Sequence, residues 1–321
     1  RPQPAQCHLT MNDDLIMSNT PDTDYSQALA EGWLPIREVS RITGVNAVTL
    51  RAWERRYGLI VPHRTAKGHR LFSTEHIQRI QHILLWLNRG VSVSQIKPLL
   101  NTPSTPAETP DSDWQTWRQT MMESIGELAE RRLDDCFNQA MSLYPARPLC
   151  EQLLMPLLND LEQRWQGQFG AQLERVFFHS WLRSKLGARI YHNNRSLKGA
   201  PVLLINHSDL PFEPQLWLTA LLVSSSHCPV EVFDAPLPNG ELGLAVEHLK
   251  PRAVVLYSSK TLNTQALPKL LGGIECPTLI AGPTVCIHFD LLSVTATEIA
   301  GLYLAHDPVE AHQRLSQLGL L

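Results

Sequence analysis

The sequence predicts a multidomain protein in which a small, mostly helical domain and a helical bundle precede an α/β domain with a doubly wound five-stranded sheet. Domains commonly have ~100–200 residues, so a chain of 321 residues is expected to form two or three. Apolar residues recur at helical spacing up to residue 194 and in short buried runs from Pro201 onwards. The proline-rich stretch 101–113 has no large apolar residue and is expected to be a linker.

The first 32 residues are polar and precede the first periodic segment. The chain begins at Arg1, and Met11 and Met17 are both plausible natural starts. Because the segment lacks the apolar core of a signal peptide, we expect a disordered leader over 1–32. No apolar run approaches the ~18 residues of a membrane helix, and the six cysteines form no CxxC pair. These features predict a cytoplasmic protein that does not associate with membranes.

The segment 36–56 has the pattern of a helix-turn-helix. A first helix over 36–43 places apolar side chains on one face, Gly44 makes the turn, and Asn46 can cap a second helix over 47–56. In such motifs the second helix enters the major groove with its N-terminal residues at base edges. The side chains expected on or near its exposed face are Thr49, Arg51 and Arg55. Those expected to supply packing are Val48, Leu50 and Trp53.

A basic hairpin is expected after this helix. Residues 57–72 predict a two-stranded wing with a turn near Lys67–Gly68. Its expected phosphate contacts are Arg64, Lys67, His69 and Arg70. Residues 33–100 hold eleven Arg or Lys and three acidic residues, a net charge of +8, which leaves −11 on the rest of a chain with net charge −3. A small basic module on an acidic protein is typical of nucleic-acid binding, and a basic solvated face is the alternative.

Three motifs follow one another in this region: IREVSRITGVNAVTLRAWERRYGL, KGHRLFSTEHIQRI and NRGVSVSQIKPLL. With them, residues 33–100 resemble the DNA-binding domain of MerR-family transcription regulators. The resemblance implies further helices over 74–88 and 92–100. It also implies binding to double-stranded promoter DNA, whose distortion affects RNA polymerase indirectly. The positions that match the family's DNA contacts are Thr49, Arg51, Arg55, Arg56 and Tyr57, with His69 and Arg70 in the wing. Tyr57 is also compatible with a core aromatic residue.

The chain departs from this family where some of its members dimerise through a long helix that follows the domain. Here Pro98 lies in the last expected helix, and further prolines follow in the linker. Because proline blocks the continuation of a helix, a long coiled coil is not expected. A homo-oligomer would therefore form through the C-terminal domains or on DNA.

Residues 114–196 have the pattern of a four-helix bundle. Apolar stripes at spacings of three and four begin at Trp114 and at Leu153. A further helix contains Phe177 and Trp181 and is expected to end near Gly187.

Residues 199–321 alternate short apolar runs with helical stretches. The expected strands are PVLLIN, VEVFDA, AVVLYS, PTLIAG and residues 301–305, and the expected helices are 213–226, 240–249, 262–272 and 307–318. This alternation predicts a mostly parallel, doubly wound sheet. No GxGxxG or GxxxxGK[ST] motif follows a strand, so a dinucleotide or P-loop nucleotide site is not supported.

A bundle followed by a five-stranded α/β domain resembles the cobalamin-binding region of light-responsive MerR-type regulators. It also resembles regulators whose matching region is not an obvious cobalamin site. The first signature of that region, a Trp followed by Glu-His, here has Trp165 with Arg175–Val176 in place of the pair. The second, an acid-x-His-x-x-Gly loop, here has His207 without the glycine, or Glu213 or Pro214 in a shifted alignment. We therefore expect no cofactor, with Trp165 and His207 as weak candidates should cobalamin bind.

The sequence thus favours a sequence-specific DNA-binding transcription regulator, controlled through a C-terminal domain that has lost its cobalamin ligands. A regulatory protein partner, or a small molecule other than cobalamin, would set its activity. The alternative is a cobalamin-dependent, light-responsive transcription repressor. An enzyme is not expected, because the chain has no nucleophile elbow, metal cluster or phosphate loop. The run Cys286-Ile287-His288 offers two ligands, too few for a metal site, so a core thiol and a surface histidine are expected.

Overall fold

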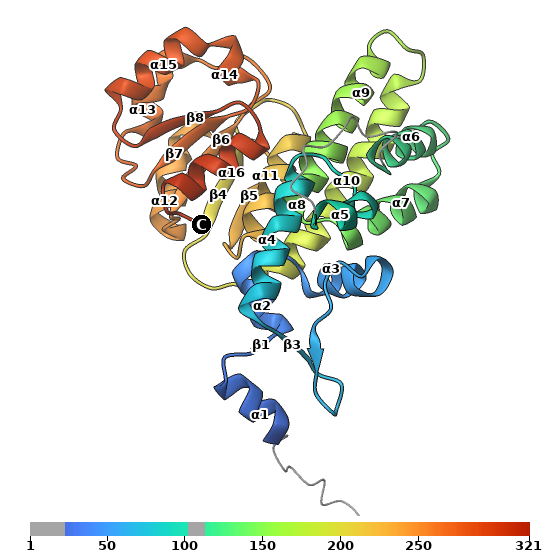
Figure 1. The fold of residues 1–321 in the computed structure, drawn as a ribbon. Coiled ribbons are helices and arrows are strands. Elements are labelled where there is room, and N and C mark those ends of the chain that lie inside the picture. The colour runs from blue at the N-terminus through green and yellow to red at the C-terminus, as the bar shows by residue number, and fades with distance from the viewer. Residues whose placement is uncertain (1–22, 102–112) are drawn as a thin grey trace, which may run out of the picture.

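The computed structural model describes residues 23–101 and 113–321, which form three domains (Figure 1). In this view the N-terminal domain lies at the bottom, the helical bundle at the upper right and the α/β domain at the upper left. The multidomain fold expected from the sequence is confirmed. The linker expected over 101–113 falls mostly outside the described residues, and Asp113 is already the first residue of a helix.

The N-terminal domain contains both helices of the expected helix-turn-helix. The first ends where Gly44 adopts a left-handed φ of 73°, and the Asn46 side chain caps the second by accepting the Val48 N–H at 2.8 Å. The strands form a three-stranded antiparallel sheet in the order β1-β3-β2, so the expected two-stranded wing gains a third strand. The elements are β1 (Leu34–Pro35), α2 (Ile36–Thr43), α3 (Ala47–Ala52), the π-helical turn η1 (Trp53–Tyr57), β2 (His63–Arg64), β3 (Arg70–Phe72), α4 (Thr74–Asn88) and α5 (Val93–Leu99).

A short helix precedes this domain. Residues 1–22 lie outside the described residues, but α1 (Thr23–Ala30) corrects the expectation of a disordered leader that continues to residue 32. The Trp33 N–H bonds to the Ala28 carbonyl at 3.0 Å, and the Tyr25 ring lies 5.1 Å from the His69 ring of the wing. The helix α1 packs on the wing. The polar composition of residues 23–30 gives no sign of this contact.

The four-helix bundle is present. Its helices are α6 (Asp113–Gly126), α7 (Glu130–Leu143), a continuous third helix made of α8 (Ala146–Pro148), the π-helical turn η2 (Leu149–Leu154) and α9 (Met155–Trp165), and finally α10 (Ala171–Asn194). The expected helix end near Gly187 is wrong, because α10 continues through this residue. A Cβ at Gly187 would lie 3.7 Å from the Trp217 ring. The glycine therefore marks a close approach of two helices.

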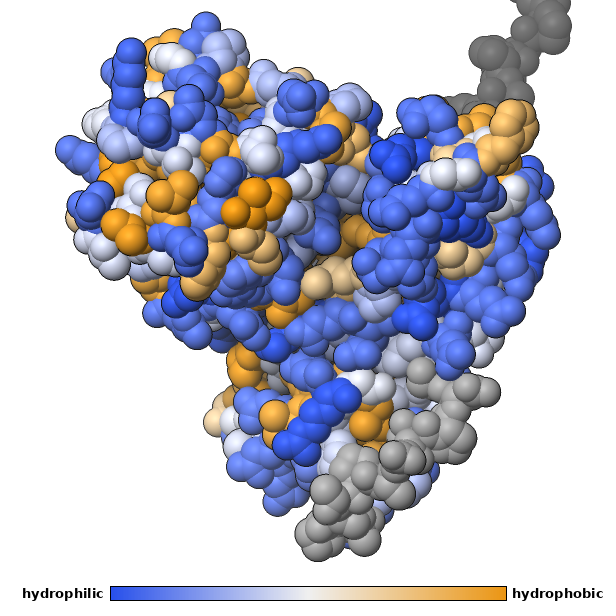
Figure 2. Space-filling model, turned by 90° about the horizontal axis from the view of Figure 1, so that it is seen from above, coloured by the Kyte–Doolittle hydropathy of each residue, from blue (hydrophilic) through white to orange (hydrophobic). Residues whose placement is uncertain are grey.

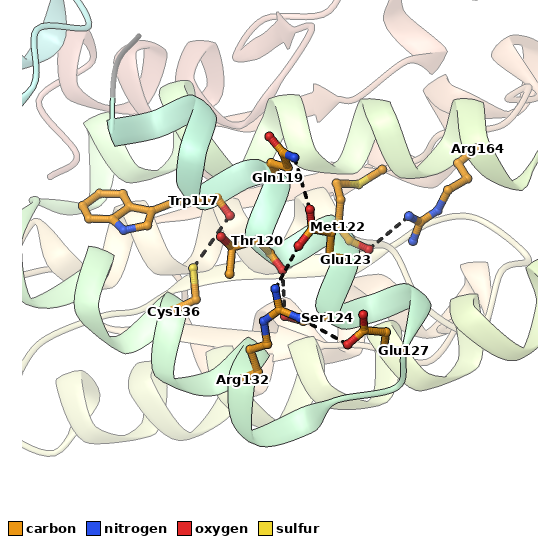
Figure 3. Close-up of polar contacts among 10 residues, drawn as sticks. All are labelled: Trp117, Gln119, Thr120, Met122, Glu123, Ser124, Glu127, Arg132, Cys136 and Arg164. Carbon is orange, nitrogen blue, oxygen red and sulfur yellow. Dashed lines mark hydrogen bonds and ion pairs between the residues drawn. The ribbon is translucent and has the colours of Figure 1, made fainter.

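Polar contacts fix the α6–α7 hairpin and connect it to α9 (Figure 3). Arg132 pairs with Glu123 at 2.8 Å and with Glu127 at 3.1 Å. These pairs are exposed, so each contributes little to stability. Arg164, at the end of α9, donates to the Met122 carbonyl at 3.0 Å. This bond holds the end of α9 against the end of α6.

The α/β domain has a parallel sheet in the order β5-β4-β6-β7-β8. Every residue of β4 and β6 is buried, which accounts for their continuous apolar runs. The chain connects in opposite directions on the two sides of β4, so the topological switch point lies between β4 and β6. The strands are β4 (Val202–Asn206), β5 (Val230–Phe233), β6 (Ala253–Tyr257), β7 (Thr278–Ala281) and β8 (Leu302–Ala305).

Helices cover both faces of this sheet (Figure 1). The face towards the bundle carries α11 (Pro214–Ser225) and α16 (Pro308–Gln317). The other face carries α12 (Leu242–Leu249), α13 (Leu267–Leu271) and α15 (Phe289–Glu298). Three short turns precede these helices, namely η3 (Asn239–Glu241), η4 (Thr264–Ala266) and α14 (Thr284–Ile287). The sequence pattern did not predict α14 and α15.

The N-terminal domain is packed on the bundle through buried contacts. The Trp53 indole N–H donates to the Leu143 carbonyl at 2.8 Å, and the Tyr144 hydroxyl accepts the Val93 N–H at 3.0 Å. One cluster of buried apolar residues runs from the N-terminal domain through the bundle into the α11 face of the sheet. In the part of the chain that the structure describes, no helix combines the length and the apolar character needed to span a bilayer.

Candidate nucleic-acid interface and effector region

The exposed side of the helix-turn-helix presents three arginines. Arg51, Arg55 and Arg56 project from α3 and η1 and are exposed. Together with Ser142 of α7 they line a hollow of about 440 Å³. Arginine can donate two hydrogen bonds to guanine and also contacts phosphates. This side of the helix can therefore read base edges, with the bundle beside it.

The opposite side of α3 is covered by the bundle. Thr49 is only 2% exposed, so the expectation that it faces outward is wrong. Val48, which was expected to pack, is 55% exposed instead. Leu50 and Trp53 are buried as expected. The contact between α3 and α7 decides which side is covered, and a helical pattern within residues 47–56 carries no information about it.

Glu54 organises the basic side chains of the wing. Its carboxylate pairs with Arg64 at 2.6 Å and with Arg70 at 2.5 Å. Burial raises the pKa of Glu54, but the hydrogen bonds and charges of Arg70 and Arg64 outweigh it, so the pKa lies below its ordinary value. Arg70 is therefore a half-buried structural cation as well as a candidate phosphate contact. Sequence reasoning missed Glu54, although an acid within a basic cluster was the available signal.

The remaining candidates lie around this centre. Lys67 and His69 are exposed at the tip of the wing, where a phosphate backbone could reach them. Tyr57 is half-buried and packs against the apolar core. Burial and the charge of Asp113 raise its pKa. Its surroundings are those of a core aromatic residue that keeps part of its surface exposed.

On the side that faces the bundle, the switch-point crevice of the sheet is filled by the chain's own side chains. Open α/β sheets bind ligands in this crevice, at the carboxyl ends of the strands. Here Tyr257 is fully buried, and its hydroxyl donates to the Gln215 side chain at 2.7 Å. Glu213, 2% exposed, accepts hydrogen bonds from the Ser259 backbone at 3.2 Å and hydroxyl at 2.7 Å. A Cβ at Gly282 would lie 2.6 Å from the Ser258 carbonyl.

His207 lies on the far side of the sheet from the bundle. Along β4, Leu203 and Ile205 face the α12–α13 side, and the alternation of a strand puts His207 on the same side. It lines a cavity of about 240 Å³ with Leu262 and Leu270. Burial lowers its pKa. This cavity volume lies below the ~300–1,000 Å³ of drug-sized sites.

Trp165, at the end of α9, packs against α10, where its ring lies 5.7 Å from the His179 ring. Its indole N–H donates to Glu174 at 3.0 Å, and Glu174 also pairs with Arg164 at 2.7 Å. The Arg175 guanidinium lies 5.0 Å from the ring centroid. Glu174 therefore satisfies the polar atom of a tryptophan that is otherwise packed in the core.

The bundle and the α/β domain form two lobes with a hollow between them (Figure 2). Where they meet, His179 of α10 lies 4.9 Å from the Phe212 ring. Burial and the charges of Arg175 and Arg183 lower the pKa of His179 to about 4, so its imidazole is neutral at pH 7. Its buried Nε2 has no hydrogen-bond partner among the described residues.

The donor set does not fit a cobalamin whose cobalt is held by an imidazole of the α/β domain. The one histidine in the loop after β4 faces away from the bundle, and the bundle side of the crevice is filled by Tyr257, Gln215 and Glu213.

The Cys286–His288 pair also differs from expectation. Cys286 is exposed, whereas His288 is half-buried and its Nε2 accepts the Leu262 N–H at 3.0 Å. Among residues 23–101 and 113–321 no group of three metal-binding side chains comes together.

Two family models match the chain in the regions just described. Residues 34–102 match the model described as MerR HTH family regulatory protein, and residues 117–190 match the model described as B12 binding domain. The N-terminal domain is thus similar to MerR helix-turn-helix domains, and the bundle is similar to B12-binding domains. The MerR domain contains the three exposed arginines and the wing, and the B12-binding-type match contains Trp165 and His179.

Several curated proteins are similar to this chain. The HTH-type transcriptional regulator MlrA of Escherichia coli strain K12 is 36% identical over 127 residues, which are 40% of this chain and 51% of MlrA. MlrA of Salmonella typhimurium strain SL1344 is 38% identical over the same length. The HTH-type transcriptional repressor CarH of Myxococcus xanthus is 24% identical over 246 residues, 71% of this chain and 79% of CarH. The chain thus spans about half the length of the MlrA proteins that it matches.

Two solved structures resemble parts of the chain at a TM-score of 0.33. One is the methanol:cobalamin methyltransferase complex MtaBC from Methanosarcina barkeri, with 14% identity, 70% of this chain and 88% of that chain covered. The other is a cobalamin-binding protein from Desulfitobacterium hafniense DCB-2, with 13% identity, 63% of this chain and 97% of that chain covered.

Proposed function

We propose that the protein is a sequence-specific DNA-binding transcription regulator. The observation that carries the proposal is the exposed row of Arg51, Arg55 and Arg56 on the second helix of a MerR-type domain. Arg51, nearest the start of that helix, reads base edges, and Arg55 and Arg56 contact the backbone. Lys67, His69 and Arg70 of the wing contact phosphates. The MlrA and CarH proteins, named as transcriptional regulator and repressor, support this assignment.

The protein acts on double-stranded promoter DNA as a homo-oligomer and influences RNA polymerase through the DNA. Two copies place their recognition helices in successive major grooves, at a spacing set by the oligomer. α5 ends at Leu99 with Pro98 inside it, so a helix continuous with α5 does not join the copies. The contacts between copies are therefore assigned to the bundle and the α/β domain.

Selection of bound duplexes from a random DNA library tests this function. The full chain is expected to enrich one motif that contains an inverted repeat. The test variant is Arg51→Ala, which removes an exposed arginine from α3. Its matched control is Arg195→Ala, which removes an exposed arginine from the end of α10. Enrichment is expected to be lost or relaxed in the first variant and unchanged in the second. Equal enrichment by all three proteins, or no enriched motif, would refute base reading by α3.

The effector region is proposed to act without cobalamin, in response to a regulatory protein partner or to another small molecule. The supporting observations are the filled crevice at Tyr257 and the outward position of His207. A second function, that of a cobalamin-dependent, light-responsive repressor, is favoured by the B12-binding-type match and by the similarity to CarH. Should cobalamin bind between the bundle and the α/β domain, the candidate contacts are His179, which lies against Phe212 of the α/β domain, and Trp165 beside it.

Titration with adenosylcobalamin in the dark separates the two candidates. The first predicts an unchanged absorbance spectrum and no co-elution of the chromophore on gel filtration. A bound chromophore with a larger assembly would establish the second. The Trp165→Phe and His179→Ala variants would then show whether the bundle wall contributes to binding.

A further inference from the structure

A polar cavity lies at the junction of all three domains. It has a volume of about 220 Å³ and is separate from both the exposed arginines and the switch-point crevice. Asn46 and Thr49 of the helix-turn-helix form one wall. Arg189 and Asn193 of α10 form another, and Ser225 and His227 close it from the end of α11.

The cavity has basic but no acidic side chains in its described lining. Its lining includes one arginine, two histidines and several hydroxyl and amide side chains, and no described lining residue is acidic. Within residues 23–101 and 113–321, the Arg189 side chain makes no hydrogen bond or ion pair. Arg183, six residues earlier on α10, pairs with Asp234 at 2.8 Å. The arginine in the cavity therefore lacks the counter-ion that its neighbour on the same helix has.

Partial burial makes a negatively charged partner of Arg189 favourable. Arg189 is half-buried, and burial lowers its pKa, although an arginine stays protonated in proteins. A partly desolvated guanidinium without a partner is unfavourable, whereas arginine with an oxyanion forms short, charge-assisted and often bidentate hydrogen bonds. The hydroxyl and amide groups around it can donate further hydrogen bonds to the same anion.

We propose that this cavity binds a small oxyanion, the phosphate or carboxylate group of a small molecule, with Arg189 as its counter-ion. The volume lies below the ~300–1,000 Å³ of drug-sized sites, so the ligand has only a few heavy atoms inside the cavity. Because Asn46 and Thr49 line the same space, the bound anion joins the helix-turn-helix to α10 and α11. It therefore stabilises the packed arrangement of the three domains and acts as an effector of the proposed regulator.

Isothermal titration calorimetry and thermal unfolding of the full chain, without DNA, test the proposal. The probes are inorganic phosphate and succinate, each added at constant ionic strength with chloride as the reference. A ligand of the folded state raises Tm, and about ten times its Kd is expected to shift Tm by roughly 2–4 °C for a chain of this size. Stronger binding of phosphate would assign a phosphoryl group, and stronger binding of succinate a carboxylate.

Three variants connect the effect to the cavity. Arg189→Gln is expected to weaken binding about tenfold or more, because it removes the charged partner of the anion. Arg189→Lys keeps the charge without the planar fork and is expected to bind with intermediate affinity. The control Arg195→Gln, exposed near the end of the same helix, should leave binding unchanged.

Two results would overturn the proposal. One is the absence of a saturable heat and Tm shift for both probes. The other is equal binding by wild type and Arg189→Gln. If Arg189→Gln fails to fold, Arg189→Lys provides the test. Wild-type affinity for the anion in that variant would argue against bidentate binding by the Arg189 guanidinium, and weakened affinity would support it. None of these results depends on whether the protein binds DNA, so the site and the proposed function are tested independently.

Discussion

Single residues close the crevice in which this fold class usually binds its ligands. Gly282 has a φ of +103°, and its Cα faces the Ser258 carbonyl and the Tyr257 ring. Tyr257 is held by its bond to Gln215. Burial, with the charge of Glu213, raises the Tyr257 pKa well above its ordinary value, so the hydroxyl stays protonated and can donate. The Tyr257 ring therefore occupies the space that a side chain at position 282 would need, and glycine at that position leaves room for the ring.

We predict that Gly282→Ala destabilises the protein by ~2–4 kcal/mol, because the new Cβ both meets the Ser258 carbonyl and forces alanine into a left-handed backbone. The control is Gly301→Ala, at a φ of +80° with nothing within 4 Å of the added Cβ. It carries the backbone cost alone, about 1 kcal/mol. Urea unfolding gives both values. Equal losses in the two variants would show that the crevice is not tightly closed.

The wing shows how an element can depend on one ion-pair centre. Glu54 lies in η1, Arg64 in β2 and Arg70 in β3, so one carboxylate joins the end of the recognition helix to both strands of the hairpin. Because Arg70 and Glu54 are largely buried, losing one partner leaves a charge with poor solvation.

Glu54→Gln is therefore predicted to lower the free energy of unfolding by ~1–3 kcal/mol at pH 7. The folded-state pKa of Glu54 lies below its ordinary value of 4.5. Its contribution is thus fully present above that value and is lost as the pH falls through the lowered pKa. The difference between wild type and variant should therefore shrink as the pH falls below 4.5. Urea unfolding across this range measures it, with the exposed Glu247→Gln as control. A difference that does not change with pH would argue against the ion pair.

The recognition helix and the wing tip are predicted to contribute differently to DNA binding. Arg51→Ala should cost about 1–3 kcal/mol on the preferred site and relax base preference, because it removes a base contact. Lys67→Ala should weaken binding to all sequences alike and reduce the salt slope by about one. Fluorescence anisotropy on cognate and scrambled duplexes at several salt concentrations measures both effects. The same change in both variants would refute this division of labour.

At the element scale much of this architecture follows from local patterns. Gly44, Asn46 and the spacing of apolar residues fix the helix-turn-helix, and the buried runs fix the parallel strands. Features set by contacts between distant segments do not follow. Thr49 is covered because α7 lies against α3, α1 forms beside the wing, and α10 continues through Gly187 where Trp217 of α11 packs against it. The packing of Tyr257 depends on Gly282, directly after β7, and on Gln215 of α11. The apolar pattern of β6 alone does not predict these contacts.

At the scale of the whole molecule the N-terminal domain and the bundle share a core. The Trp53–Leu143 and Tyr144–Val93 hydrogen bonds are both buried and connect residues at least 50 positions apart in the chain. The two domains are therefore expected to unfold together, and a change at their contact reaches the recognition helix directly. The Arg189 cavity lies beside this contact, because Tyr144 lines it, so a ligand bound there would act on the packing of the two domains.

Trp53→Phe is predicted to destabilise both domains together by about 1–3 kcal/mol, because the buried Leu143 carbonyl loses its donor. Far-ultraviolet circular dichroism and tryptophan fluorescence should report one coincident transition at a lower urea concentration. Trp33→Phe, at a half-buried indole, is the control and should change little. Two separate transitions in the wild-type protein would contradict the shared core.

The most direct test of the central claim is the affinity of the full chain for its selected duplex relative to a scrambled duplex at physiological salt. The account predicts a preference of about 10³ or more, together with an affinity that falls steeply as the salt concentration rises. Equal affinity for the two duplexes would contradict the claim that this protein is a sequence-specific regulator.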